Sequence, residues 1–263
     1  MQRQVAPNGL GIGHGGTPDG PPVVFVHGAM DRGAAFLRVA RLLPETSWWV
    51  YDRRGYGRSA DAGTTDFEGH VGDLVEILEH VRSSTGSAPV LVGHSLGGTI
   101  ALTATYRRPD LVAALATYEA ALSWAPWWEA RYPLLDPPDP DREAERFLRR
   151  ILGDERWLAL PAATRERRRR DGQAYVAEFG SARRQEGFAA NEIAVPVLLA
   201  HGTSTGSAQP ARAAEEMVAE LRHGRRVVFE GAPHGAHLSH PAEMADLVRQ
   251  ALAAATNGRP AGQ

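Results

Sequence analysis

The pentapeptide Gly-His-Ser-Leu-Gly at residues 93–97 is the strongest chemical signal in the chain. It follows an apolar run at residues 90–92, which is typical of a buried strand, and a helical pattern begins at Gly98. A sharp strand-to-helix turn of this kind exposes the hydroxyl of Ser95 and aims the backbone N–H of Leu96 at a developing oxyanion. The same pentapeptide occurs in ordinary glycine-rich turns, but its place at the end of an apolar strand favours a nucleophile.

A histidine that could activate this serine follows the last apolar run. His234 ends a Gly-Ala-Pro loop after residues 226–229, and an imidazole there would take the serine proton as a general base. The alternative is a surface histidine. His237 and His240 follow at three-residue spacing, which is also a metal-binding pattern, but this loop contains no carboxylate or thiolate. We therefore predict no metal site.

Short apolar runs alternate with amphipathic stretches, which is typical of βαβ units and a mostly parallel sheet. The runs are almost continuously apolar, as strands buried on both faces are. A Gly-x-Gly-x-x-Gly motif at residues 11–16 would have to follow a strand and open a helix in a dinucleotide site. It leads instead into Thr-Pro-Asp-Gly-Pro-Pro at residues 17–22, so we interpret it as a flexible turn. We predict strands at residues 23–26, 48–51, 90–92, 112–117, 197–200 and 227–229, and helices at residues 67–82, 98–106, 210–221 and 241–255.

One interval interrupts this alternation. Residues 123–190 contain no strand-like run, but they carry several prolines and then helical stretches rich in arginine and glutamate. We predict a helical cap over residues 123–190, inserted into an α/β core made of residues 1–122 and 191–255. A disordered tail is expected at residues 256–263.

Three further segments resemble the α/β-hydrolase family. Residues 23–30 form an apolar strand that ends in His-Gly, and residues 51–59 resemble the Asp-x-Arg-Gly-x-Gly-x-Ser segment of that family. Residues 231–234 resemble the loop that carries its catalytic histidine. The segments occur in the order of the family, and the resemblance covers residues 23–110 and 195–248. It implies an α/β-hydrolase fold, but it does not extend to the cap.

The resemblance also implies how the site residues act. Ser95 would attack a carbonyl carbon, His234 would accept its proton, and the backbone N–H groups of Ala29 and Leu96 would form the oxyanion hole. Members of the family that cleave haloalkanes or epoxides use an aspartate nucleophile, so the serine argues against both reactions. This chemistry needs no metal or organic cofactor.

The acid of the triad is absent from its commonest position in the family. Thr205 stands where an aspartate is expected, after the strand at residues 197–200, and the next carboxylate is Glu215 inside the following helix. Glu119 ends the strand that follows the nucleophile helix. This position resembles that of a catalytic glutamate in a subset of haloalkane dehalogenases and in fungal zearalenone lactone hydrolases. We predict Glu119 as the acid; the alternatives are Asp52, a Glu119 that only anchors the cap, and a missing acid.

These residues predict hydrolysis of a carboxylic ester or lactone through an acyl-enzyme on Ser95. The same triad would also serve hydrolysis of a carbon–carbon bond in a β-diketone or a cofactor-free perhydrolase activity. An alternative of another class is a non-catalytic protein that binds a small molecule. Aromatic residues at the start of the cap favour an apolar or aromatic substrate, although packing of the cap on the core explains them equally well. The predicted substrate-binding residues are Met30, His94, Trp124, Trp127 and Trp128.

Composition excludes several other classes of function. The chain has 263 residues and a formal net charge of −2, which gives no reason to expect nucleic acid or an anionic membrane as partner. It contains no cysteine and no lysine, so thiolate and Schiff-base chemistry are excluded. The N-terminal stretch lacks the apolar segment of a secretory signal, and the apolar runs are too short to cross a bilayer. We expect a cytoplasmic monomer or homodimer that acts on a small molecule without a cofactor.

Overall fold

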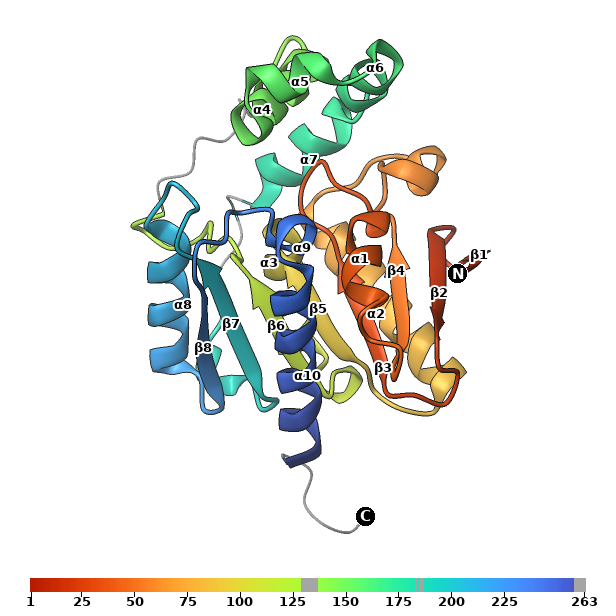
Figure 1. The fold of residues 1–263 in the computed structure, drawn as a ribbon, viewed down its shortest axis with the longest axis vertical. Helices are drawn as coiled ribbons and strands as arrows, with labels where there is room; N and C mark the ends of the chain where they lie inside the picture. The colour runs from red at the N-terminus through yellow and green to blue at the C-terminus, as the bar shows by residue number, and fades with distance from the viewer. Residues whose placement is uncertain (129–136, 183, 185–186, 258–263) are drawn as a thin grey trace.

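The computed structural model describes residues 1–128, 137–182, 184 and 187–257. An eight-stranded sheet runs through the centre of the molecule in the order β1-β2-β4-β3-β5-β6-β7-β8 (Figure 1). β2 is antiparallel to both of its neighbours, and all the other pairs are parallel. The mostly parallel sheet that the sequence predicts is therefore confirmed. The strands are β1 (Gln2–Val5), β2 (Gly11–Gly16), β3 (Pro22–Val26), β4 (Ser47–Tyr51), β5 (Val90–His94), β6 (Ala114–Tyr118), β7 (Val197–Gly202) and β8 (Gly224–Phe229).

Helices cover both faces of this sheet. The α-helices are α1 (Leu37–Ala40), α2 (Phe67–Thr85), α3 (Leu96–Arg107), α4 (Pro140–Leu152), α5 (Asp154–Ala159), α6 (Ala162–Arg169), α7 (Gly172–Ala182), α8 (Gln209–Glu220), α9 (Ala236–Ser239) and α10 (Pro241–Asn257), and the 3-10 helices are η1 (Gly33–Phe36), η2 (Gly57–Ala62), η3 (Pro109–Leu111) and η4 (Ala190–Glu192). Val24 and Val26 of β3 pack in one hydrophobic cluster with α2, α3 and α8, whereas Val23 and Phe25 pack in a second cluster with α1 and α10. Successive side chains of a strand point to opposite faces, so both faces of β3 are buried.

The predicted strands correspond to β3 to β8, but the prediction of a flexible turn at residues 11–16 is wrong. This segment is β2, and it pairs with β1 and β4. Its glycines make room for large neighbouring side chains, because a Cβ on Gly15 would lie 2.5 Å from the ring of Trp48. The glycine-rich composition here therefore serves close packing within a sheet and does not mark a turn.

Helices α4 to α7 lie between β6 and β7 in the sequence and at the top of the molecule in Figure 1. They occupy the interval in which the sequence predicts a cap. A buried carboxylate fastens α7 to the core: Glu178 lies 2.5 Å from Nη1 of Arg53 and accepts a 2.7 Å hydrogen bond from the hydroxyl of Tyr56. The division into cap and core stays a prediction.

The C-terminal helix α10 continues to Asn257, beyond the predicted boundary at residue 255. The rest of the predicted tail lies outside the described residues. No helix in the part of the chain that the structure describes is long and apolar enough to cross a membrane.

Candidate active site

Ser95 stands at the sharp turn between β5 and α3. Its backbone has a φ of 52° and a ψ of −126°, a conformation that is costly for a residue with a side chain and that often marks a functional site. The flanking glycines allow a close approach of the chain. A Cβ on Gly97 would lie 2.4 Å from the carbonyl oxygens of Val26 and His27, and a Cβ on Gly93 would lie 2.6 Å from the backbone of α3. The turn therefore needs glycine at both positions.

The loop after β3 carries Ala29, one of the predicted oxyanion donors. His27 orders this loop, because its Nδ1 donates to the carbonyl of Gly28 at 2.8 Å and its Nε2 accepts from the backbone N–H of Arg53 at 2.9 Å. Burial and the positive charge of Arg53 hold the pKa of His27 well below its ordinary value, so the ring is neutral and can donate and accept at once. Leu96, the second predicted donor, is the first residue of α3.

Glu119 follows β6 and meets His234 at the end of the sheet. Its Oε2 lies 2.5 Å from Nδ1 of His234, and its Oε1 accepts a 3.0 Å hydrogen bond from the backbone N–H of Gly202. The carboxylate is fully buried, whereas 33% of the imidazole side chain is exposed. A carboxylate on Nδ1 fixes the ring proton there and leaves Nε2 free to accept a proton from a nucleophile. The contact that Glu119 needs as the triad acid is present, and its catalytic role stays a prediction.

The two other positions considered for the acid make different contacts. Asp52 accepts hydrogen bonds from the backbone N–H groups of Gly33 at 2.8 Å and Arg58 at 2.9 Å, so it organises the loops that follow β3 and β4. The hydroxyl of Thr205 donates to the carbonyl of Ser207 at 2.9 Å within the loop after β7. Neither contact involves the imidazole.

Backbone contacts hold the loop of His234 beside the nucleophile turn. Nε2 of His94 donates to the carbonyl of His234 at 2.8 Å, and the two rings lie 4.7 Å apart. The hydroxyl of Tyr118 donates to the carbonyl of Pro233 at 2.9 Å. Among the described residues, the hydroxyl of Ser95 makes no hydrogen bond to the imidazole. Such contacts are often long in ligand-free enzymes and tighten when the substrate binds.

Two of the predicted substrate-binding residues are buried. Met30 is buried and has a φ of 58°, and its carbonyl accepts a 2.9 Å hydrogen bond from Arg168 of α6. His94 is also buried. Burial and the neighbouring rings of His237 and His234 hold the pKa of His94 well below its ordinary value, so this side chain is neutral. Contact of either residue with a substrate stays a prediction.

The three tryptophans predicted at the substrate site are half-buried and pack against the core. Trp127 packs against α8, where the guanidinium of Arg212 lies 4.3 Å from its ring and Glu216 accepts a hydrogen bond from its indole N–H. These contacts favour the packing interpretation for Trp127. Substrate contacts of Trp124 and Trp128 stay predictions.

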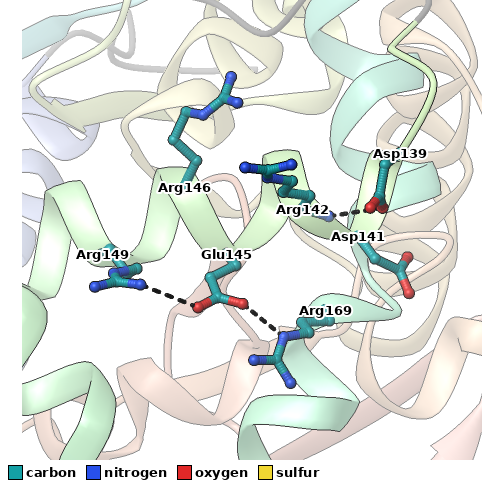
Figure 2. A pocket seen from close by; sticks show the side chains of 7 residues that line it. All are labelled: Asp139, Asp141, Arg142, Glu145, Arg146, Arg149 and Arg169. Carbon is teal, nitrogen blue, oxygen red and sulfur yellow. Dashed lines mark hydrogen bonds and ion pairs between the residues drawn. The ribbon is translucent and has the colours of Figure 1, made fainter.

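A charged pocket of about 530 Å³ is lined by residues 139–149 and Arg169, in the region of α4 and α6 (Figure 2). Three of its groups pair with each other: Glu145 accepts hydrogen bonds from Arg169 at 2.7 Å and from Arg149 at 3.4 Å. The pocket contains no nucleophile and none of the triad residues. It is therefore not the place where the predicted chemistry occurs.

The sequence did not reveal Asp31 as a residue of the site, nor its contact with His237. Oδ2 of Asp31 lies 3.0 Å from Nε2 of His237, and this contact joins the loop after β3 to α9. The sequence gives little indication of this contact, because Asp31 is marked only by its place after the oxyanion loop and His237 only by its place three residues after His234. The two residues are 206 positions apart, and spacing along the chain cannot reveal such a pair.

Comparison with known proteins shows the family of this chain. The sequence pattern of the alpha/beta hydrolase family matches residues 23–247. The chain belongs to this family. The match includes the nucleophile turn, the loop after β3, Glu119 and His234, and it confirms the family and the fold that the sequence predicts.

Several proteins similar to this hydrolase are named as lipases or esterases. Lipase LipV of Mycobacterium tuberculosis is 36% identical over 40% of this chain and 40% of its own length, so that match spans less than half of either protein. A pimeloyl-[acyl-carrier protein] methyl ester esterase of Aliivibrio salmonicida is 25% identical over 86% of this chain and 89% of its own. The structure of a thermophilic esterase from Thermogutta terrifontis has a TM-score of 0.68 at 20% identity, covering 97% of this chain and 99% of that one. The structural likeness shows the shared fold.

Proposed function

We propose that this hydrolase cleaves carboxylic esters, including cyclic ones, with Ser95 as nucleophile, His234 as base and Glu119 as acid. The observation that carries the proposal is the 2.5 Å contact between Glu119 and Nδ1 of His234, at the end of the sheet where Ser95 holds its strained conformation. The relatives support the ester bond as the target, because one is named a lipase and another a methyl ester esterase.

The mechanism follows from these positions. Nε2 of His234 takes the proton of Ser95 while the serine oxygen attacks the carbonyl carbon, and Glu119 stabilises the imidazolium that forms. The N–H groups of Ala29 and Leu96 stabilise the oxyanion, each contributing about 3–4 kcal/mol to the transition state. The imidazolium then protonates the leaving alcohol. A water molecule activated by the same imidazole releases the acid from the acyl-enzyme.

We propose an apolar or aromatic group on the substrate. Trp124 and Trp128 are half-buried in the segment that follows Glu119 in the chain. Aromatic side chains near a site favour apolar ligands. A panel of p-nitrophenyl esters of increasing chain length, with aryl esters and lactones, tests this point. Equal kcat/KM values for acetate and for long or aryl esters would contradict it.

Replacement of the nucleophile tests the proposal most directly. Ser95→Ala should lower kcat by roughly 10⁶-fold, as in other serine hydrolases, because the attacking atom is lost. Ser207→Ala, in an exposed loop, is the matched control and should keep the wild-type rate. Ester turnover and covalent labelling by a fluorophosphonate are the measurements.

Labelling also separates the alternatives. A protein that only binds a small molecule would leave the fluorophosphonate unreacted, because it has no activated serine. A carbon–carbon bond hydrolase would be labelled at Ser95 but would cleave a β-diketone with a higher kcat/KM than any ester. Either result would overturn ester hydrolysis as the function.

A further inference from the structure

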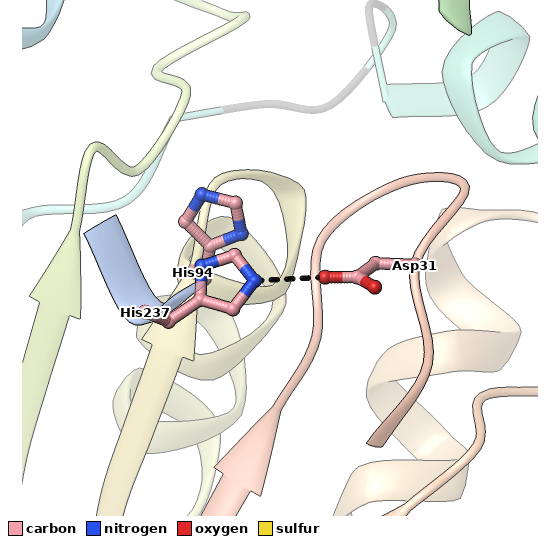
Figure 3. A group of neighbouring side chains, drawn as sticks. All are labelled: Asp31, His94 and His237. Atoms are coloured by element: carbon pink, nitrogen blue, oxygen red, sulfur yellow. Dashed lines mark hydrogen bonds and ion pairs between the residues drawn. The ribbon is translucent and has the colours of Figure 1, made fainter. Parts of the chain in front are cut away.

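A cluster of three potential metal ligands lies directly behind the nucleophile turn (Figure 3). It consists of Asp31 from the loop after β3, His94 from the end of β5 and His237 from α9. One ligand atom of each residue lies within 4.8 Å of the other two. The cluster thus joins the three segments that carry the oxyanion loop, the nucleophile and the base.

The two ring nitrogens of His94 have different surroundings. Nε2 donates to the carbonyl of His234, so the ring proton is there and Nδ1 presents a lone pair. Nδ1 is buried and has no hydrogen-bond partner. Figure 3 shows one ring nitrogen of His94 pointing toward the pair of Asp31 and His237, and the nitrogen not used by His234 is Nδ1. Gly28 leaves the room for it, because a Cβ there would lie 2.9 Å from this atom.

The other two ligand atoms are already close together. Oδ2 of Asp31 lies 3.0 Å from Nε2 of His237. Four-coordinate zinc with bonds of about 2.0–2.1 Å keeps its ligand atoms roughly 3.3 Å apart. The pair thus has nearly the required spacing. Nδ1 of His94 lies within 4.8 Å of both atoms and would move inward to complete a set of three.

We propose that Asp31, His94 and His237 bind one zinc ion, through Oδ2, Nδ1 and Nε2 respectively. Two imidazoles and a carboxylate favour zinc or cobalt over magnesium and calcium, which prefer oxygen ligands alone. The hydrogen bond from Nε2 of His94 to a backbone carbonyl is the outer contact that metal-bound histidines usually make. In the bound state His237 carries its proton on Nδ1, which is buried and makes no hydrogen bond in this structure. The side chain of Asp31 is 22% exposed, which gives an ion access and leaves a fourth position for water.

Such a site differs from the expectation from the sequence that this chain binds no metal. His234, His237 and His240 did not predict a site, because their loop has no carboxylate. The fold supplies the carboxylate from another loop, and it replaces two of those histidines with His94. The ion would stabilise the relative positions of the catalytic segments, since its three ligands come from different parts of the chain.

Cobalt titration of the metal-free protein tests the site without any reference to catalysis. The wild type should bind one equivalent of Co²⁺ with the strong visible absorption of four-coordinate cobalt, and Zn²⁺ should displace it and raise Tm. Asp31→Asn removes a ligand and should weaken the affinity by at least about 100-fold, because loss of even an outer contact costs 10–100-fold. His240→Gln, on the same loop but outside the cluster, is the matched control and should bind like the wild type.

A second variant guards against adventitious binding at the triad. His234→Ala removes the exposed imidazole and should keep the cobalt spectrum and the Zn²⁺-dependent rise in Tm. Absence of a four-coordinate spectrum in the wild type would overturn the proposal. So would loss of binding in His234→Ala together with unchanged binding in Asp31→Asn. Cobalt titration of the wild type tests the metal site even if a variant fails to fold.

Discussion

Two buried glutamates of this hydrolase each meet a basic partner at 2.5 Å, and the two pairs differ in what surrounds them. Glu178 of α7 faces Arg53 with both side chains at most 1% exposed, and it also accepts a hydrogen bond from Tyr56. Glu119 faces His234, whose side chain remains 33% exposed. The first pair is enclosed on every side, whereas the second leaves part of its basic partner open to a reacting group.

The two glutamates also differ in backbone conformation. Glu178 lies within a regular helix, but Glu119 has a φ of 51°, in the region that residues with side chains avoid. Among the described residues other than glycine, only Met30, Ser95 and Glu119 have positive φ values, and all three belong to the predicted site. Strained backbone concentrated at one place indicates function, so the pairs should respond differently to the same substitution.

The largest expected effect is on turnover. Glu119→Gln should lower kcat by roughly 10²- to 10⁴-fold, because an amide on Nδ1 fails to hold the right tautomer and to stabilise the imidazolium. The fold should survive, since an amide oxygen can still accept the hydrogen bond from Gly202. Glu230→Gln, an exposed glutamate after β8, is the control. Near-normal turnover of Glu119→Gln would refute its assignment as the acid.

The matching change in the other pair should act on stability. Glu178→Gln leaves the charge of Arg53 buried without its partner, which should lower the free energy of unfolding by about 3–5 kcal/mol. Glu166→Gln, at an exposed ion pair with Arg169, should change it by less than about 1 kcal/mol. Urea denaturation measures both. Equal effects of the two substitutions would show that burial does not distinguish these pairs.

Acid should weaken the enclosed pair in a defined range of pH. Burial raises the pKa of Glu178, but the charge of Arg53 and contact with His70 outweigh it and lower that pKa from 4.5 to about 2. The carboxylate therefore stabilises the folded state above pH 4.5, and this stabilisation is lost as the pH falls toward 2. Burial lowers the pKa of His70 below 6.5, so its neutral form makes stability fall as the pH drops below 6.5.

Denaturation from pH 7.5 to pH 3 should therefore show a falling free energy of unfolding, with a slope of up to about 1.4 kcal/mol per pH unit for each group. Glu178→Gln should show a shallower fall below pH 4.5, because it has lost one of the two groups. An identical pH profile for variant and wild type would contradict the lowered pKa of Glu178.

The smallest expected effect is a rescue. Thr205→Asp in a Glu119→Ala background should recover about tenfold in kcat, if the aspartate can take over the contact with the imidazole. Thr205 lies in the loop after β7, where most members of the family carry their acid. Ser207→Asp in the same background places a carboxylate in the same loop and should recover nothing. Equal recovery by both would indicate a general effect of charge.

The sequence was sufficient for the features that local pattern encodes. Apolar runs identified β3 to β8, and the carboxylate at the end of one run identified Glu119 as a partner for His234. The burial of His70 is harder to predict from the sequence: this residue lies on the buried face of α2, three residues after Phe67. The spacing of residues along the helix indicates a buried position, but a polar side chain usually indicates an exposed one.

Other features depend on contacts that no local pattern contains. β2 consists mostly of glycine, and the close approach of neighbours such as Arg58 to Gly11 and Trp48 to Gly15 explains why. The contact of Asp31 with His237 joins loops from opposite ends of the chain. Glu178 looks like any helical glutamate in sequence, and its burial depends on where α7 lands on the core. Tertiary packing decides each of these cases.

The position of Glu119 also has an evolutionary consequence. Its carboxylate accepts a hydrogen bond from the backbone of Gly202, the last residue of β7. No residue of the loop beyond Gly202 takes part in this contact. Thr203 and Ser204 donate to the backbone of the segment that leads to His234, at Phe229 and Ala232. With Glu119 as the acid, the exposed tip from Gly206 to Ala208 would need no catalytic residue. Insertions and deletions at that tip would escape selection for turnover. On that assignment, the loop after β7, which carries the acid in most of the family, would be free to vary in length in this hydrolase.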